Sequence, residues 1–148
     1  MNIIIYYDSK KGKTKKAAEE ICRILKEHNH PCEAISVENA DKQTLDAVQL
    51  IFFGAWTKGL FLMGQRPTKQ YRDFVDNLAG LEGKKAVVFC TYNIYTGPML
   101  KNMKKQLEER KLFVIGKFKC RRPVLNDSVR TFINEILLQY SQEEQRKH

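Results

Sequence analysis

Short apolar segments alternate with amphipathic ones along the whole chain, and this alternation most constrains the fold. Apolar runs of strand length occupy residues 2–7, 33–37, 50–53, 85–92 and 112–118. Four of these runs are followed by segments whose apolar residues recur at helical spacing, at 14–28, 67–78, 97–107 and 126–140. Strands that alternate with helices predict an α/β fold, with a parallel sheet covered by helices on both faces.

The chain has the length and composition of one globular domain. It has 148 residues, of which 43% are hydrophobic and 29% are charged, so a core can form and disorder is not expected. No linker or repeat divides the sequence, which predicts a single domain over residues 1–148 with a polar tail at 141–148 that frays. No apolar stretch reaches the ~18–20 residues that a membrane span requires.

The four cysteines are expected to be reduced, mostly buried thiols. They are widely spaced and none forms a CxxC motif, so the sequence predicts no metal site: Cys22, Cys32, Cys90 and Cys120. Free cysteines commonly behave as small apolar residues and persist in reducing compartments. The N-terminal segment also lacks the features of a signal peptide. These observations predict a cytoplasmic protein.

The segment Ser9-Lys10-Lys11-Gly12-Lys13-Thr14 joins the first expected strand to the first expected helix and is typical of a phosphate site. Backbone N–H groups at a helix N-terminus attract anions, and so does the helix dipole. The hydroxyl groups add donors, the lysines add positive charge, and a glycine lets the backbone approach closely. The alternative is an ordinary N-cap at Thr14 among solvated lysines.

Two other phosphate-handling classes fit the sequence poorly. A nucleoside triphosphatase loop ending in Gly12-Lys13-Thr14 requires another glycine five places earlier, where this chain has Tyr7. The expected strand ends also supply no carboxylate to hold Mg²⁺. A phospho-acceptor receiver domain requires an aspartate after the third strand, and Gly54-Ala55-Trp56 offers none.

Aromatic residues follow the third and fourth expected strands. The third is followed by Gly54-Ala55-Trp56-Thr57-Lys58-Gly59, which holds the single tryptophan, and the fourth ends in Thr91-Tyr92-Asn93-Ile94-Tyr95-Thr96-Gly97. The carboxyl ends of strands in such a sheet form its ligand site, so these aromatic residues could sandwich a flat ring. The alternative is that they cap the ends of the core.

Together the three loops resemble the FMN site of the flavodoxin family, over almost the whole chain from Asn2 to about Tyr140. Ser9, Gly12 and Thr14 match the family's phosphate loop, whereas Lys11 replaces a usual hydroxyl residue. The resemblance implies a flavodoxin-like three-layer sandwich with the five strands in the order 2-1-3-4-5. It also implies FMN as the cofactor.

The resemblance further implies which residues bind FMN. The phosphate would be held by Ser9, Lys10, Lys11, Gly12, Lys13 and Thr14. Trp56 would stack on one face of the isoalloxazine ring, and Tyr92 or Tyr95 on the other. The remaining cofactor-binding candidates lie beside these aromatic residues and are Ala55, Thr57, Lys58, Gly59, Thr91, Asn93 and Gly97. Electron transfer itself implies no catalytic acid, base or nucleophile, because the flavin carries the chemistry.

The function implied is that of an FMN-binding electron-transfer protein that shuttles electrons between a reductase and an acceptor protein. Two alternatives remain open. One is an FMN-dependent quinone or NAD(P)H oxidoreductase, in which the apolar residues 59–64 cover the ring. The other is a flavodoxin-like interaction module that has lost the flavin and retains an anion site.

The charge of the chain departs from the family pattern. The net charge is +9, and basic residues flank the expected site at Lys10, Lys11, Lys13, Lys58 and Arg66, whereas typical flavodoxins are acidic there. This predicts redox partner proteins with acidic docking surfaces. The other basic residues are scattered without a stacking platform of aromatic residues, so no nucleic-acid partner is expected. We also expect no membrane partner, and a monomer or weak dimer.

Overall fold

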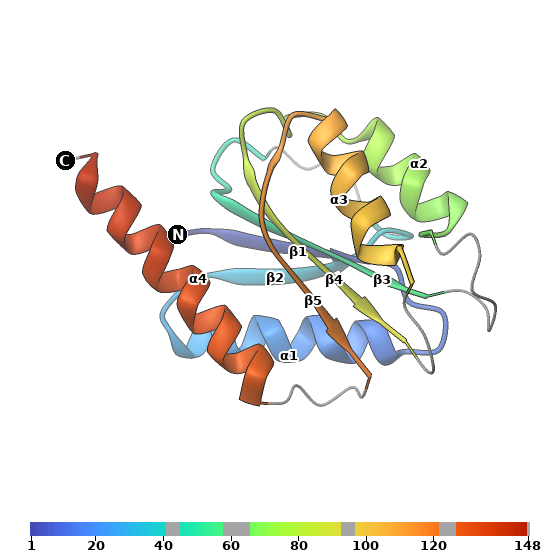
Figure 1. Ribbon diagram of the computed structural model, residues 1–148, viewed down its shortest axis with the longest axis horizontal. Coiled ribbons are helices and arrows are strands. Elements are labelled where there is room, and N and C mark those ends of the chain that lie inside the picture. The colour runs from blue at the N-terminus through green and yellow to red at the C-terminus, as the bar shows by residue number, and fades with distance from the viewer. Residues whose placement is uncertain (41–44, 58–65, 93–96, 122–126, 148) are drawn as a thin grey trace.

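A parallel β-sheet forms the centre of the molecule (Figure 1). The computed structural model describes residues 1–40, 45–57, 66–92, 97–121 and 127–147. Within these residues the sheet has five strands in the order β2-β1-β3-β4-β5, which confirms the expected topology. The strands are β1 (Ile3–Tyr7), β2 (Cys32–Ser36), β3 (Leu50–Trp56), β4 (Lys85–Thr91) and β5 (Phe113–Cys120).

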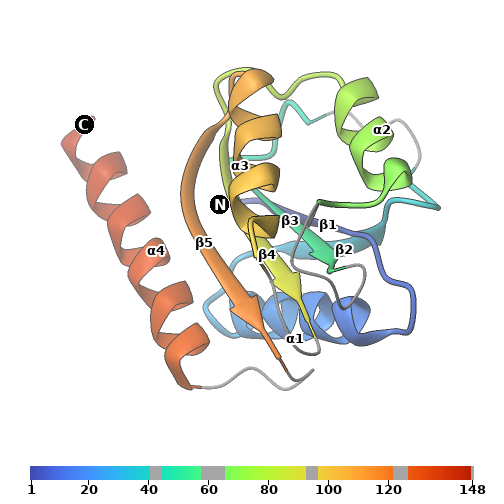
Figure 2. The ribbon, with the colours of Figure 1, turned by 45° about the vertical axis from the view of Figure 1, so that its right-hand side comes forward.

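Helices cover both faces of the sheet (Figure 2), as the alternating pattern predicts. The helices α1 (Lys13–Glu27) and α4 (Asp127–Arg146) contribute to one core cluster, which includes Ile5 of β1. The helices α2 (Lys69–Asn77) and α3 (Met99–Glu109) contribute to the other cluster, which includes Tyr6. Successive residues of a strand point to opposite faces, so β1, buried along its whole length, supplies both clusters.

Two segments differ from the expectations at their ends. The α4 helix continues to Arg146, through most of the 141–148 segment that the sequence suggested would fray. The strand β3 does not end at Phe53 but continues to Trp56, which pairs with Thr91 of β4. No helix among the described residues is long and apolar enough to cross a membrane.

Close packing explains why a glycine stands inside β3 rather than in a loop. A Cβ atom added at Gly54 would lie 2.1 Å from Cζ of Phe89, a fully buried residue on β4. The Phe89 ring stacks on Phe118 of β5, with 5.4 Å between the ring centroids. The glycine therefore makes room for an aromatic ring in the core, and it marks a close approach rather than a turn.

A buried carboxylate joins the end of β1 to the start of α2. Asp8 is only 4% exposed, and its Oδ2 accepts a hydrogen bond from Thr68 Oγ1 at 2.5 Å. The same Thr68 oxygen accepts from the backbone N–H of Tyr71 at 3.2 Å and so caps α2. Burial raises the pKa of Asp8 above its usual value, although hydrogen bonds from Thr68 and Trp56 partly oppose this effect.

We expect Gly54→Ala to lower the free energy of unfolding by about 1–3 kcal/mol, because the new methyl group overpacks the core against Phe89. Urea denaturation measures the change. In the double variant Gly54→Ala/Phe89→Leu, the smaller side chain relieves the clash, so the combined loss should be less than the sum of the two single losses. Strictly additive losses would contradict this explanation of Gly54.

The buried Asp8 carboxylate predicts a pH-dependent stability. Because its pKa in the folded protein lies above the unfolded value of about 4, ionisation at higher pH costs the folded state more than the unfolded state. The stability of the Asp8→Asn variant relative to wild type should therefore increase as pH rises from about 4 through the raised pKa, and then level off. Urea denaturation between these pH values tests this.

A matched variant corrects for the loss of one negative charge in that experiment. Asp73→Asn removes an exposed carboxylate from α2 and leaves the Asp8 hydrogen bonds in place. A stability difference between Asp8→Asn and Asp73→Asn that stays constant with pH would show that Asp8 does not titrate as the burial requires.

Candidate functional site

The carboxyl ends of β1, β3 and β4 bring the predicted segments together at one edge of the sheet. Tyr7 of β1 pairs with Gly54 of β3, and Trp56 of β3 pairs with Thr91 of β4. The backbone N–H of Asp8 then donates to the Gly54 carbonyl at 2.9 Å, and that of Thr57 donates to the Thr91 carbonyl, also at 2.9 Å. The sheet ladder thus continues into the segments that leave the strands.

The first segment forms an open helix N-terminus. Gly12 is the N-cap residue of α1 and adopts a left-handed conformation with φ of 88°. Its backbone N–H donates to Ser9 Oγ at 3.1 Å, and no described side chain caps the helix. A Cβ atom placed at Gly12 would meet no described atom within 4 Å. Thr14 lies within the helix, so the alternative of an N-cap at Thr14 is wrong.

Positive charge is concentrated at this helix end. Residues 10–16 include five exposed lysines and no acidic residue, namely Lys10, Lys11, Lys13, Lys15 and Lys16. The positive end of the helix dipole faces the same way, so these charges repel it and one another. A bound anion would relieve both repulsions, and no described atom fills the space beside Gly12 where one would bind.

A pair of buried hydroxyl groups ties the first segment to the third. Thr14 is 1% exposed and Thr91 is 4% exposed, and their Oγ1 atoms lie 2.7 Å apart. One hydroxyl donates to the other, which leaves one hydroxyl hydrogen for a further acceptor. This contact holds the beginning of α1 against the end of β4, and the sequence spacing gave no sign of it.

The tryptophan is held from two directions. Trp56 ends β3 in a partly buried position and donates a hydrogen bond to the buried Asp8 carboxylate. Nζ of Lys10 lies 5.2 Å from the centroid of its ring. A similar contact lies at the ends of β4 and β5, where Nζ of Lys119 is 5.7 Å from the ring centroid of Tyr92. Two aromatic residues at the sheet edge are therefore each covered by a lysine.

Sequence reasoning missed two of these partners, Asp8 and Lys119. Asp8 lies one residue beyond the first expected strand, and Lys119 lies one residue beyond the fifth. Both contacts depend on how the strands pair, so the local sequence pattern gives no signal of either role.

Of the remaining predicted site residues, the structure describes Ala55, Thr57 and Gly97. Ala55 is 0% exposed, and its side chain packs in the same core cluster as Tyr6. The buried Thr57 hydroxyl meets the Cys90 thiol but no oxygen or nitrogen partner among the described residues. Gly97, with φ of 50°, precedes α3. The other candidates lie outside the described residues, and they are Lys58, Gly59, Asn93 and Tyr95.

Comparison with known proteins gives the same architecture. An archaeal flavodoxin is 19% identical and covers 100% of both chains with a TM-score of 0.74. A flavodoxin from Megasphaera elsdenii is 24% identical over 86% of this chain and 90% of that chain, with a TM-score of 0.72. A flavodoxin from Streptococcus pneumoniae is 14% identical over 94% and 99%, with a TM-score of 0.75. At these identities the likeness shows the fold.

The family itself is shown by a sequence comparison. No curated protein matches the chain. The family model described as "Flavodoxin domain" matches residues 4–148, which include every segment of the site described above. The chain therefore belongs to the flavodoxin family, whose members bind FMN and transfer electrons.

Proposed function

We propose that this protein is an electron carrier that binds FMN at the edge of the sheet and shuttles electrons between a reductase and an acceptor protein. The proposal rests on one observation. The open, basic N-terminus of α1 lies beside Trp56, at the carboxyl ends of β1 and β3. When bound, FMN supplies the redox chemistry. The protein binds it, orients it and sets the charge around it.

The phosphate would bind in front of Gly12. The first backbone N–H groups of α1 point there, and the surrounding lysines supply charge. When Thr91 donates to Thr14, the Thr14 hydroxyl hydrogen is left to donate to a phosphate oxygen. The free space at Gly12 and the uncapped helix thus fit the phosphate group of FMN.

The flat ring would lie against Trp56. The hydrogen bond to Asp8 restricts the rotation of the indole, so its face is already oriented before the cofactor binds. The partly buried Tyr92, at the end of the adjacent strand, is the described candidate for the other face. Among the described residues the buried Thr57 hydroxyl meets only the Cys90 thiol, and it would gain a stronger partner from the polar edge of the ring.

The charge around the site supports acidic partner surfaces. Lys10 and Lys119 each cover an aromatic residue of the site, and Lys11, Lys13 and Arg121 are exposed at the same strand ends. A basic rim of this kind attracts an acidic surface and speeds association at low salt. The proposal places this carrier in the cytoplasm, as one domain that acts as a monomer or weak dimer.

Titration of the apo-protein with FMN tests the cofactor site. FMN should produce a yellow complex and strongly quench the emission of Trp56, because the ring stacks on the indole. Thr14→Val should weaken binding by about 1–3 kcal/mol, because a phosphate oxygen loses a donor. The matched control Thr131→Val changes an exposed hydroxyl on α4 and should bind FMN normally. Unaltered tryptophan emission at saturating FMN would refute the stacking.

A kinetic measurement separates the carrier from the enzyme alternative. The FMN-loaded protein alone should not sustain NAD(P)H oxidation with a quinone, and turnover should require an added reductase. Steady turnover without a reductase would favour the oxidoreductase instead.

Charge substitution tests the effect of the basic rim on the flavin. Negative charge accumulates at the site on full reduction, and a unit charge ~6 Å away at a dielectric of ~20 contributes about 2–3 kcal/mol, or roughly 100 mV. Exposure reduces this several-fold. Lys10→Gln should therefore lower the more negative flavin potential by tens of millivolts, and more so at low salt. In the control Lys147→Gln, at an exposed position just after α4 and away from the site, the potential should not change, whereas equal shifts in both variants would refute the local effect.

A further inference from the structure

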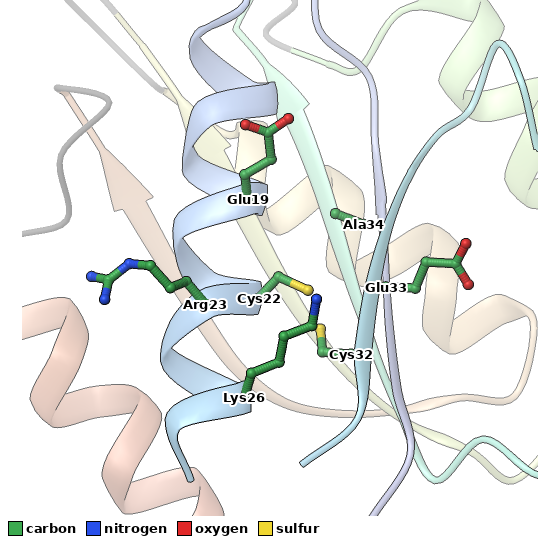
Figure 3. A pocket seen from close by; sticks show the side chains of 7 residues that line it. All are labelled: Glu19, Cys22, Arg23, Lys26, Cys32, Glu33 and Ala34. Carbon is green, nitrogen blue, oxygen red and sulfur yellow. The ribbon is translucent and has the colours of Figure 1, made fainter. Parts of the chain in front are cut away.

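A surface hollow between α1 and the beginning of β2 brings two of the cysteines together. It has a volume of about 340 Å³ and is lined by Glu19, Cys22, Arg23, Lys26, Cys32, Glu33 and Ala34. Figure 3 shows the sulfur atoms of Cys22 and Cys32 turned toward each other, with the Lys26 amine beside them. Cys32 is the first residue of β2, so the hollow lies at the opposite end of the strands from the FMN site.

The two thiols are hydrogen-bonded to each other and differ in acidity. The Cys32 thiol donates to the Cys22 sulfur, and this bond lowers the pKa of Cys22 below its usual value, against the opposing effect of burial. In return, the bond raises the pKa of Cys32, because that proton is held between the sulfurs. One member of the pair is therefore poised to be a thiolate and the other a thiol.

The charges that face the pair come from both elements. Glu19, Arg23 and Lys26 lie on α1, and Glu33 lies on β2. Arg23 is paired with Glu20 and Glu27, whereas Lys26 has no ion pair with any described residue. The Lys26 ammonium stabilises a thiolate at Cys22, and the Glu33 carboxylate opposes it.

We propose that Cys22 and Cys32 form a redox-active dithiol that reduces hydrogen peroxide or an organic hydroperoxide and closes to a disulfide. The Cys22 thiol releases its proton, and the thiolate attacks a peroxide oxygen, so that an S–O bond forms and the O–O bond breaks. Hydroxide leaves, or an alkoxide from an organic hydroperoxide, and takes up the proton that Cys22 released. Cys32 then attacks the sulfur of the Cys22 sulfenic acid, an S–S bond forms, and the hydroxyl group leaves as water with the Cys32 proton. Overall, two thiols lose two electrons, and hydrogen peroxide becomes two molecules of water.

The other two cysteines provide an internal comparison. Cys90 is fully buried and Cys120 is 5% exposed. Burial raises the pKa of Cys90 to about 12 and that of Cys120 to about 11, so both remain thiols at neutral pH. Neither lines the hollow beside Lys26. Cys22 and Cys32 are themselves only 6% and 9% exposed, so the hollow and the nearby Lys26, rather than exposure, distinguish this pair from the other two thiols.

Peptide mapping of the peroxide-treated protein tests the proposal. The full-length FMN-loaded protein is reduced, freed of reductant, treated with a small excess of hydrogen peroxide in the dark, and alkylated. We expect a Cys22–Cys32 disulfide, with Cys90 and Cys120 recovered as alkylated thiols. Cys32→Ser should form no disulfide and should accumulate a sulfenic acid at Cys22 that dimedone traps. The matched control Cys120→Ser should behave as wild type.

Two charge variants test the geometry without removing a sulfur. Lys26→Gln should move the pH at which peroxide oxidation is half-maximal upward, and Glu33→Gln should move it downward, because the two side chains act on the Cys22 thiolate in opposite senses. Recovery of Cys22 and Cys32 as alkylated thiols to the same extent as Cys90 would overturn the proposal. A disulfide that joins other cysteines, or pH shifts in the same direction for both charge variants, would also overturn it.

Discussion

The site depends on the parallel pairing of β3 with β4, which continues beyond Phe53, where the sequence pattern placed the end of the strand. The β3 strand runs on through Gly54 to Trp56, and its last residue pairs with Thr91 of β4. This extension requires a position without a Cβ atom, since Phe89 occupies the space beside Gly54. The glycine therefore lets Phe89 pack beside β3 without interrupting the strand before Trp56.

Polar contacts between strand ends then fix the groups that the ladder brings together. The Thr14–Thr91 hydroxyl pair joins α1 to β4, and the Asp8–Thr68 hydrogen bond joins β1 to α2. Each contact lies where the chain leaves the sheet, and each gives a hydrogen-bond partner to buried side-chain oxygens that backbone pairing between strands does not serve. The same contacts hold the helix N-terminus and the indole in place before a cofactor arrives, which reduces the ordering that binding must impose.

Charge and burial divide α1 into two chemical regions. Its N-terminus gathers lysines that repel the helix dipole and one another, and a bound anion would relieve that repulsion. Cys22, in the middle of α1, belongs to the core cluster and also lines the hollow beside β2. The proposed FMN site and the proposed dithiol thus share one helix but lie at opposite ends of the sheet.

Local periodicity in the sequence predicted the five strands and their helices, which the structure confirms. Groups adjacent in the chain also predict an anion site at residues 9–14. The sequence pattern placed the end of β3 too early, because a glycine that makes room for a ring resembles a turn residue. Only the tertiary structure paired Thr14 with Thr91, Asp8 with Thr68 and Cys22 with Cys32. The first two pairs span 77 and 60 residues, and strand order and register alone bring such distant side chains into contact.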